Sequence, residues 1–123
     1  MNIRDENGWT PLLCAISIHD ASLPLVQLLA EHGADVNHRS HDGTTPLERA
    51  TLYANPTMIE YLVSKGARVN GLCSMGRVPL HLSCRESNFG TVECLVELGA
   101  NLSARDDHGN TPLDLAIRHQ PSP

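Results

Sequence analysis

A repeating unit of about 33 residues constrains the fold of this chain more strongly than any other feature. Each unit contains a Pro-Leu pair, a glycine three residues before the proline, and, in three of the units, a Gly-Ala pair. These markers are Pro11, Pro46, Pro79 and Pro112; Gly8, Gly43, Gly76 and Gly109; and Gly33, Gly66 and Gly99. A fixed period of this length indicates stacked supersecondary units rather than one globular core. Such an array presents a long, variable surface on a repeated scaffold.

Composition and charge restrict the class of protein. The chain has 123 residues, of which 41% are hydrophobic and 19% are charged, as expected of one folded domain spanning residues 1–123. The net charge of −5 and the absence of a basic stripe argue against binding to nucleic acid. No apolar run reaches the length of a bilayer, and no signal-peptide pattern opens the chain. We therefore expect no membrane association.

The cysteines indicate the cellular compartment. Cys14, Cys73, Cys84 and Cys94 form no Cys-x-x-Cys pair, and three of them fall at apolar positions of the repeat. This usage fits buried thiols in a reducing compartment better than a disulfide framework. We expect the protein in the cytoplasm or the nucleus.

Each unit carries signals for two short helices. The proline stands where the first helix begins, and in three units a threonine before it can cap that helix. Val78 takes the threonine's place in the third unit, so this unit is expected to lose its cap. Apolar residues then mark a second helix around residues 25–29, 58–62 and 91–95. Helices of this length are unstable alone and must pack against neighbouring units.

The motifs resemble the ankyrin repeat. The third unit contains Pro79-Leu80-His81, and the Gly-Ala-x-Val-Asn motif occurs at residues 33–37 and 66–70, with a weaker version at 99–103. The resemblance implies an all-α solenoid of stacked antiparallel helix pairs joined by β-hairpin loops. It places the repeats at about residues 4–36, 39–69 and 72–102, with a partial repeat at 105–120.

The chain departs from the regular pattern in several places. It begins within a loop motif and ends after a first helix, which suggests either a segment of a longer array or a small protein with a frayed last helix. The first unit has two extra residues between its helices, within residues 17–24. Arg49 occupies the position of Cys14, Leu82 and Leu115, where a charge is costly unless it is paired or reaches water. It is either a local weak spot or a contact for a partner.

The resemblance implies that partners bind to the loop tips and to the concave face of the first helices. Trp9 is the only tryptophan, and the fold does not require a large side chain at its position. It is either an interface anchor or a lid over the end of the array. Tyr53, Leu72, Met75 and Arg77 extend the same stripe. The complete set of expected partner-binding residues is Trp9, Arg39, His41, Thr44, Tyr53, Leu72, Met75, Arg77, Arg85, Asp107 and Asn110.

Two other residue patterns could suggest chemistry. His81 and Cys84 lie three residues apart on one helix, but no third residue completes a catalytic or metal site, and the resemblance implies that His81 bonds the backbone of a neighbouring loop. The resemblance also marks Asn37 and Asn70 as positions where some ankyrin proteins are hydroxylated. The structural interpretation is that their side chains bond the hairpin turn.

The resemblance and the residues together predict a non-catalytic module that binds a protein or peptide, without cofactor or metal and as a monomer. One alternative is an inhibitor or regulatory subunit that occludes an enzyme. Another is an architectural segment of a longer ankyrin array.

Overall fold

The computed structural model describes residues 4–18, 20–86 and 88–118. This part of the chain forms α-helices with one short 3-10 turn and contains no β-strand. The helices are α1 (Pro11–Ile16), α2 (Leu23–Glu31), α3 (Pro46–Leu52), α4 (Pro56–Ser64), α5 (Pro79–Arg85), α6 (Phe89–Glu97) and α7 (Pro112–Arg118), and the 3-10 turn is η1 (Ser74–Gly76). None of these helices is long and apolar enough to cross a membrane.

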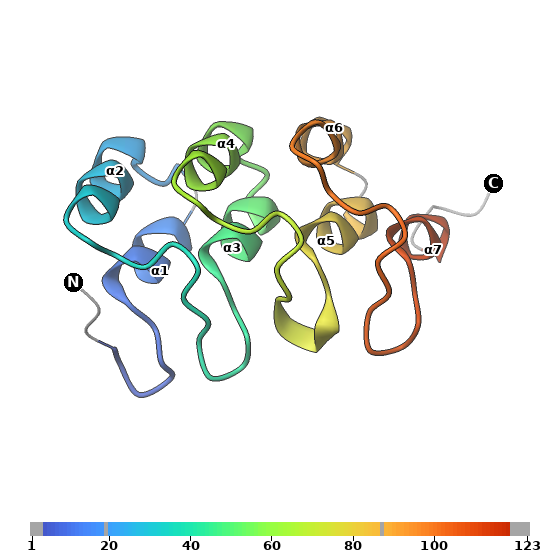
Figure 1. Ribbon diagram of the computed structural model, residues 1–123, viewed down its shortest axis with the longest axis horizontal. Helices are drawn as coiled ribbons and strands as arrows, with labels where there is room; N and C mark the ends of the chain where they lie inside the picture. The colour runs from blue at the N-terminus through green and yellow to red at the C-terminus, as the bar shows by residue number, and fades with distance from the viewer. Residues whose placement is uncertain (1–3, 19, 87, 119–123) are drawn as a thin grey trace.

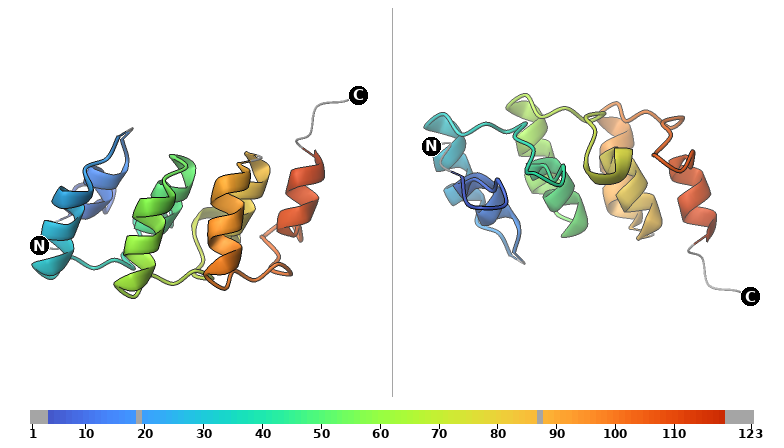
Figure 2. Two further views of the ribbon diagram at one scale, coloured as in Figure 1. Left: turned by 90° about the horizontal axis from the view of Figure 1, so that it is seen from above. Right: turned by 90° about the horizontal axis from the view of Figure 1, so that it is seen from below.

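The helices form two rows, as the resemblance implied. In Figure 1, α2, α4 and α6 lie above α1, α3, α5 and α7, and the connecting loops hang below the lower row. Figure 2 shows the successive units side by side along the array. The first helices α1, α3 and α5 each contact the first helix of the next unit as well as the second helix of their own. The predicted all-α stack of helix pairs is therefore confirmed.

The caps explain where the first helices begin. The hydroxyl of Thr10 accepts a hydrogen bond from the amide of Leu13, and Thr45 accepts one from Glu48. At Val78 no side-chain oxygen is available, as predicted. Instead, Nδ1 of His81 accepts the amide proton of Val78 at 3.0 Å, so this histidine orders the helix start.

The core runs along the array between the two rows. At the first position after the proline, Leu12, Leu47 and Leu80 are buried, and Val26, Ile59 and Leu95 are buried on the second helices. The equivalent residue of α7 is Leu113, which is 65% exposed, since no described helix lies beyond α7. Burial at these positions thus depends on the neighbouring unit, as expected of a repeat stack.

The loops are tight turns rather than strand-forming hairpins. Two backbone bonds close each loop, for example from the amide of Ser40 to the oxygen of Thr44 at 2.9 Å and from the amide of Gly43 to the oxygen of Ser40 at 3.0 Å. Gly43 lies inside this loop at a φ of 89°, a conformation that favours glycine. Because each loop makes so few such bonds, no ladder forms in the described residues, and the implied hairpins appear as turns.

Candidate protein-binding surface

Arg49, on α3, lies close to two aromatic rings. Its guanidinium carbon is 5.5 Å from the centre of the Trp9 ring and 5.4 Å from that of Tyr53. Its Nε donates a hydrogen bond to the hydroxyl of Ser17 at 3.0 Å, and Nη2 lies 3.4 Å from the Tyr53 hydroxyl. All four side chains are partly buried. We call Trp9, Arg49 and Tyr53 the aromatic–arginine cluster.

The cluster shows the surroundings of the two residues for which the sequence left alternatives open, Arg49 and Trp9. The charge of Arg49 is paired with two ring faces and a hydroxyl, so its position is not simply a weak spot. The ring of Trp9 lies against Arg49 of the following unit. The cluster therefore fixes a large aromatic side chain in a half-exposed position.

A hollow of about 320 Å³ lies beside the cluster. It is lined by Asn7, Trp9, His41 and Asp42 from the first two loops. The amide of His41 donates to the oxygen of Asn7 at 3.0 Å, which holds these loops together. Hydrogen bonds from Ser40 and Thr44 lower the pKa of the Asp42 carboxyl, which keeps it charged at the rim.

The structure brings some of the predicted partner-binding residues together and separates others. Trp9, Tyr53 and His41 lie at the first two units, close to the cluster and the hollow. Arg39 and Leu72 line a different groove near the beginning of α3. Met75, Arg85 and Asp107 are exposed in the third and fourth units. The expected stripe is therefore divided among separate parts of the surface.

Two predicted residues are buried. The hydroxyl of Thr44 donates to Asp42 at 2.8 Å, and the backbone oxygen of Asn110 accepts a bond from His81 at 2.8 Å. Arg77 is largely buried beside Asp106, with Nε 3.9 Å from a carboxylate oxygen. These three residues make contacts inside the loops and expose little surface area to which a partner could bind.

The loop anchors were missed by the sequence reasoning. A carboxylate oxygen of Asp106 accepts the amides of His108 and Asn110, both at 2.9 Å, and Asp5 does the same for Asn7 and Trp9. Cys73 holds the equivalent position in the third loop and has no carboxylate. That loop instead forms the turn η1.

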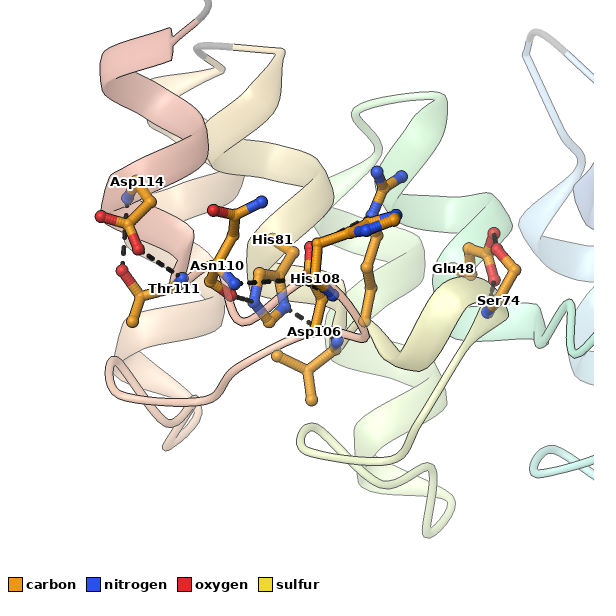
Figure 3. A network of polar contacts seen from close by, with 10 residues as sticks. Glu48, Ser74, His81, Asp106, His108, Asn110, Thr111 and Asp114 are labelled. Atoms are coloured by element: carbon orange, nitrogen blue, oxygen red, sulfur yellow. Dashed lines mark hydrogen bonds and ion pairs between the residues drawn. The ribbon is translucent and has the colours of Figure 1, made fainter.

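Glu48 is a second missed residue (Figure 3). It is buried, and its carboxylate accepts the amide of Ser74 at 3.2 Å and the hydroxyl of Ser74 at 2.9 Å. Glu48 stands in the register position of His81, which bonds the next loop through Asn110. The sequence did contain a signal for this contact, because the charged Glu48 replaces histidine at a position that faces the neighbouring loop.

The asparagine side chains join neighbouring units. Asn37 donates to the oxygen of Gly66 at 2.9 Å and accepts the amide of Arg68 at 3.0 Å. Asn70 makes the same pair of bonds with Gly99 and Asn101. The expectation that these side chains bond their own hairpin turn is therefore wrong, because their partners lie in the following unit. Hydroxylation of either residue stays a prediction.

The residues considered for chemistry have structural surroundings. His81 is fully buried, and both of its ring nitrogens lie at hydrogen-bonding distance from backbone groups. Burial raises the pKa of the Cys84 thiol, which disfavours the reactive thiolate. Within the described ranges, no group of three histidine, cysteine, aspartate or glutamate residues could hold a metal ion.

Two family models match the chain. One, described as ankyrin repeats in three copies, matches residues 1–72. The other, described as ankyrin repeats in many copies, matches residues 62–116. Together they extend from residue 1 to residue 116, which takes in α1 to α6 and most of α7.

Curated relatives match over shorter stretches. An ankyrin repeat-containing protein, P1E11.10, of Schizosaccharomyces pombe is 46% identical over 46 residues, covering 37% of this chain and 21% of that protein. The putative ankyrin repeat protein YahD of Escherichia coli is 46% identical over 55 residues, covering 41% and 27%. Neurogenic locus notch homolog protein 1 of Mus musculus is 44% identical over 59 residues, covering 48% and 2%. The matches thus span about a quarter or less of these relatives.

Proposed function

Because the chain belongs to the ankyrin repeat family, we propose that it binds a protein or peptide partner through the aromatic–arginine cluster and the adjacent loops. Ankyrin repeats are in general protein-interaction modules without catalytic activity of their own. The finer assignment, to particular residues of this chain, rests on the geometry around Arg49.

The observation that carries the proposal is the contact of the Arg49 guanidinium with the rings of both Trp9 and Tyr53. Tryptophan, tyrosine and arginine are the residues most enriched among those that dominate binding energy at interfaces. Here the three side chains are already ordered by their mutual contacts and by Ser17. A partner would therefore lose little side-chain entropy from this surface on binding.

The hollow next to Trp9 adds a place for a partner's side chain. Asp42 lies at its rim, and His41 is exposed beside it. Met75, Arg85 and Asp107 would then form the outer part of the interface along the third and fourth units. Charged residues of this kind affect association rate and specificity more than affinity.

We also propose that the protein works in a reducing compartment, the cytoplasm or the nucleus. The four cysteines are free, and Cys73 and Cys94 are buried in the packing between units. Free buried thiols of this kind are ordinary in reducing compartments.

The test is a comparison of binding between matched variants. Proteins captured from extract by the wild-type chain would be quantified against those captured by Trp9→Ser and Arg49→Ala. Phe89→Ser is the control, because Phe89 is 80% exposed at the start of α6, in the other helix row. We expect the specific partner to be lost with the two cluster variants and retained with the control.

Stability must be measured in parallel, since the cluster also joins two units. Circular dichroism at rising temperature would show whether each variant remains folded at the temperature of the assay. Retention of every captured protein by folded Trp9→Ser and Arg49→Ala would contradict the proposal.

A further inference from the structure

A second surface lies near the beginning of α3, at the junction of the second and third units. It is a groove of about 260 Å³ with an apolar part formed by Val36, Leu47 and Leu72. The side chains of Arg39 and Arg68 also line it. Val36 and Leu47 are buried, whereas Leu72 is 55% exposed. The groove therefore combines an apolar floor with two positive charges.

The two arginines have no acidic partner in the described part of the chain. No carboxylate there lies within 4.0 Å of either guanidinium, although the chain as a whole carries a net charge of −5. Arg39 makes one long contact, from Nη2 to the backbone oxygen of Cys73 at 3.4 Å. Both side chains are exposed, so their remaining donors face solvent.

Arg68 occupies a position where the fold favours a different residue. In the first unit Asp35 stands there and accepts the amide of Asn37 at 2.8 Å. In the third unit Asn101 accepts the amide of Ser103 at 3.0 Å. An arginine side chain has no acceptor and cannot make this bond. Arg68 thus lacks the side-chain hydrogen bond that stabilises this turn in the other units, and it places a positive charge in the groove.

Gly71 allows Arg68 to lie close to the backbone of residue 71. The second and fourth units have His38 and Ala104 at the equivalent position, but Gly71 has no side chain. A Cβ atom there would lie 3.1 Å from Cβ of Arg68 and 3.2 Å from its backbone oxygen. Leu72 also departs from the register, because Arg39 and Arg105 stand at its position in the neighbouring units. Three departures from the repeat therefore coincide at one groove.

We propose that this groove binds a peptide segment in which an acidic residue adjoins an aliphatic one. The guanidinium groups of Arg39 and Arg68 pair with the carboxylate, and the aliphatic side chain packs against Leu47 and Leu72. The volume is below that of most sites for drug-sized ligands and suits one or two side chains.

This site is separate from the aromatic–arginine cluster. Thr45 caps the first end of α3 and lines the groove, whereas Tyr53 caps the other end and belongs to the cluster. The helix between them is seven residues long, about 10 Å. Failure of one proposal therefore leaves the other intact.

The experiment titrates the ¹⁵N-labelled chain with acetyl-Glu-Leu-amide and follows backbone amide shifts. We expect saturable shifts confined to residues 36–39, 45, 47 and 68–72, with a dissociation constant in the millimolar range, on the order of 1–10 mM. Acetyl-Gln-Leu-amide and acetyl-Glu-Gly-amide should each bind about fivefold more weakly. Inorganic phosphate should shift these amides less than the dipeptide does.

Variants separate a binding role of Arg68 from a structural one. Arg68→Asn restores the acceptor that Asn101 provides in the next unit, so we expect thermal stability equal to or above the wild type and binding weakened about fivefold. Arg39→Gln should weaken binding similarly. Arg105→Gln is the control, because Arg105 has the register position of Arg39 in the fourth unit, and binding should not change.

Several results would overturn the proposal. These are equal binding of the glutamine dipeptide, equal shifts with phosphate, shifts centred elsewhere, or no saturation up to about 50 mM dipeptide. Loss of stability in Arg68→Asn without loss of binding would also overturn it, since Arg68 would then serve the fold.

Discussion

Nε2 of His81 lies 2.8 Å from the backbone oxygen of Asn110, and this contact joins α5 to the loop of the following unit. Nδ1 of the same ring accepts the amide of Val78, so one buried side chain both starts its helix and secures the next loop. In the second unit Glu48 replaces the histidine and reaches Ser74 instead (Figure 3). The two residues show that the units are held together by different polar contacts at equivalent positions.

Replacing His81 with alanine should lower the free energy of unfolding by about 2–4 kcal/mol. The change leaves the amide of Val78 and the oxygen of Asn110 without their partner and creates a cavity. Urea unfolding followed by circular dichroism gives the value. His108→Ala is the control, since His108 is exposed in the neighbouring loop. Two variants of equal stability would contradict the bridging role of His81.

Replacing Glu48 with alanine should lower the free energy of unfolding by about 1–3 kcal/mol, because the amide and hydroxyl of Ser74 lose a charged acceptor. A double-mutant cycle with Ser74→Ala should show a coupling of at least about 0.5 kcal/mol. Glu60→Ala, at an exposed site on α4, should change stability little. A coupling near zero would mean that the Glu48–Ser74 contact does not contribute to stability.

The helices could be predicted from the sequence because their signals are local. Thr45 before Pro46 is sufficient to predict the start of α3. The contact of Glu48 with Ser74 could not be found this way, because it spans 26 residues and depends on how α3 meets the following loop in space. Likewise, the repeat spacing marked Arg49 as unusual, but it did not predict that the rings of Trp9 and Tyr53 would both lie over its guanidinium.

The candidate binding surface was predictable only as a set of loop positions. Repeat spacing places Leu72 and Trp9 on equivalent segments, yet the structure separates them, because Leu72 packs along the groove at the start of α3. The position of Thr44 in the repeat also did not indicate that it is buried, with its hydroxyl donating a hydrogen bond to Asp42. The repeat also gave no sign of η1, in which Met75 has a φ of 61° and its backbone oxygen accepts the amide of Asp107 in the next loop at 3.2 Å.

Asn37→Ala and Asn70→Ala should each reduce the free energy of unfolding by about 1–2 kcal/mol. Each amide side chain makes two hydrogen bonds to the backbone of the following unit, although both are partly exposed to water. Chemical unfolding measures the loss. Asn7→Ala is the matched control, because no hydrogen bond of its side chain is found among the described residues. Asparagine variants as stable as this control would show that the bridges contribute nothing.

Alkaline pH should destabilise the fold through Cys73. Burial, the largest cause, raises the pKa of its thiol to about 12 from the usual 9.0, and the charge of Glu48 adds to the effect, while a hydrogen bond with Thr45 partly opposes it. Between these values the unfolded chain releases the thiol proton and the folded chain keeps it. The contribution of Cys73 to stability is therefore fully present below pH 9 and is lost as the pH rises toward 12.

The contribution of Cys73 can be isolated by comparing how steeply the free energy of unfolding falls with pH in the wild type and in a variant without this thiol. Over this range one thiol changes the free energy of unfolding by about 1.4 kcal/mol per pH unit, so Cys73→Ala should lose stability less steeply than the wild type by up to that amount. Urea unfolding from below pH 9 to about 11 gives both slopes. Cys14→Ala, which removes an exposed thiol, should follow the wild-type slope. If Cys73→Ala also follows it, the thiol of Cys73 ionises as readily in the folded chain as in the unfolded one.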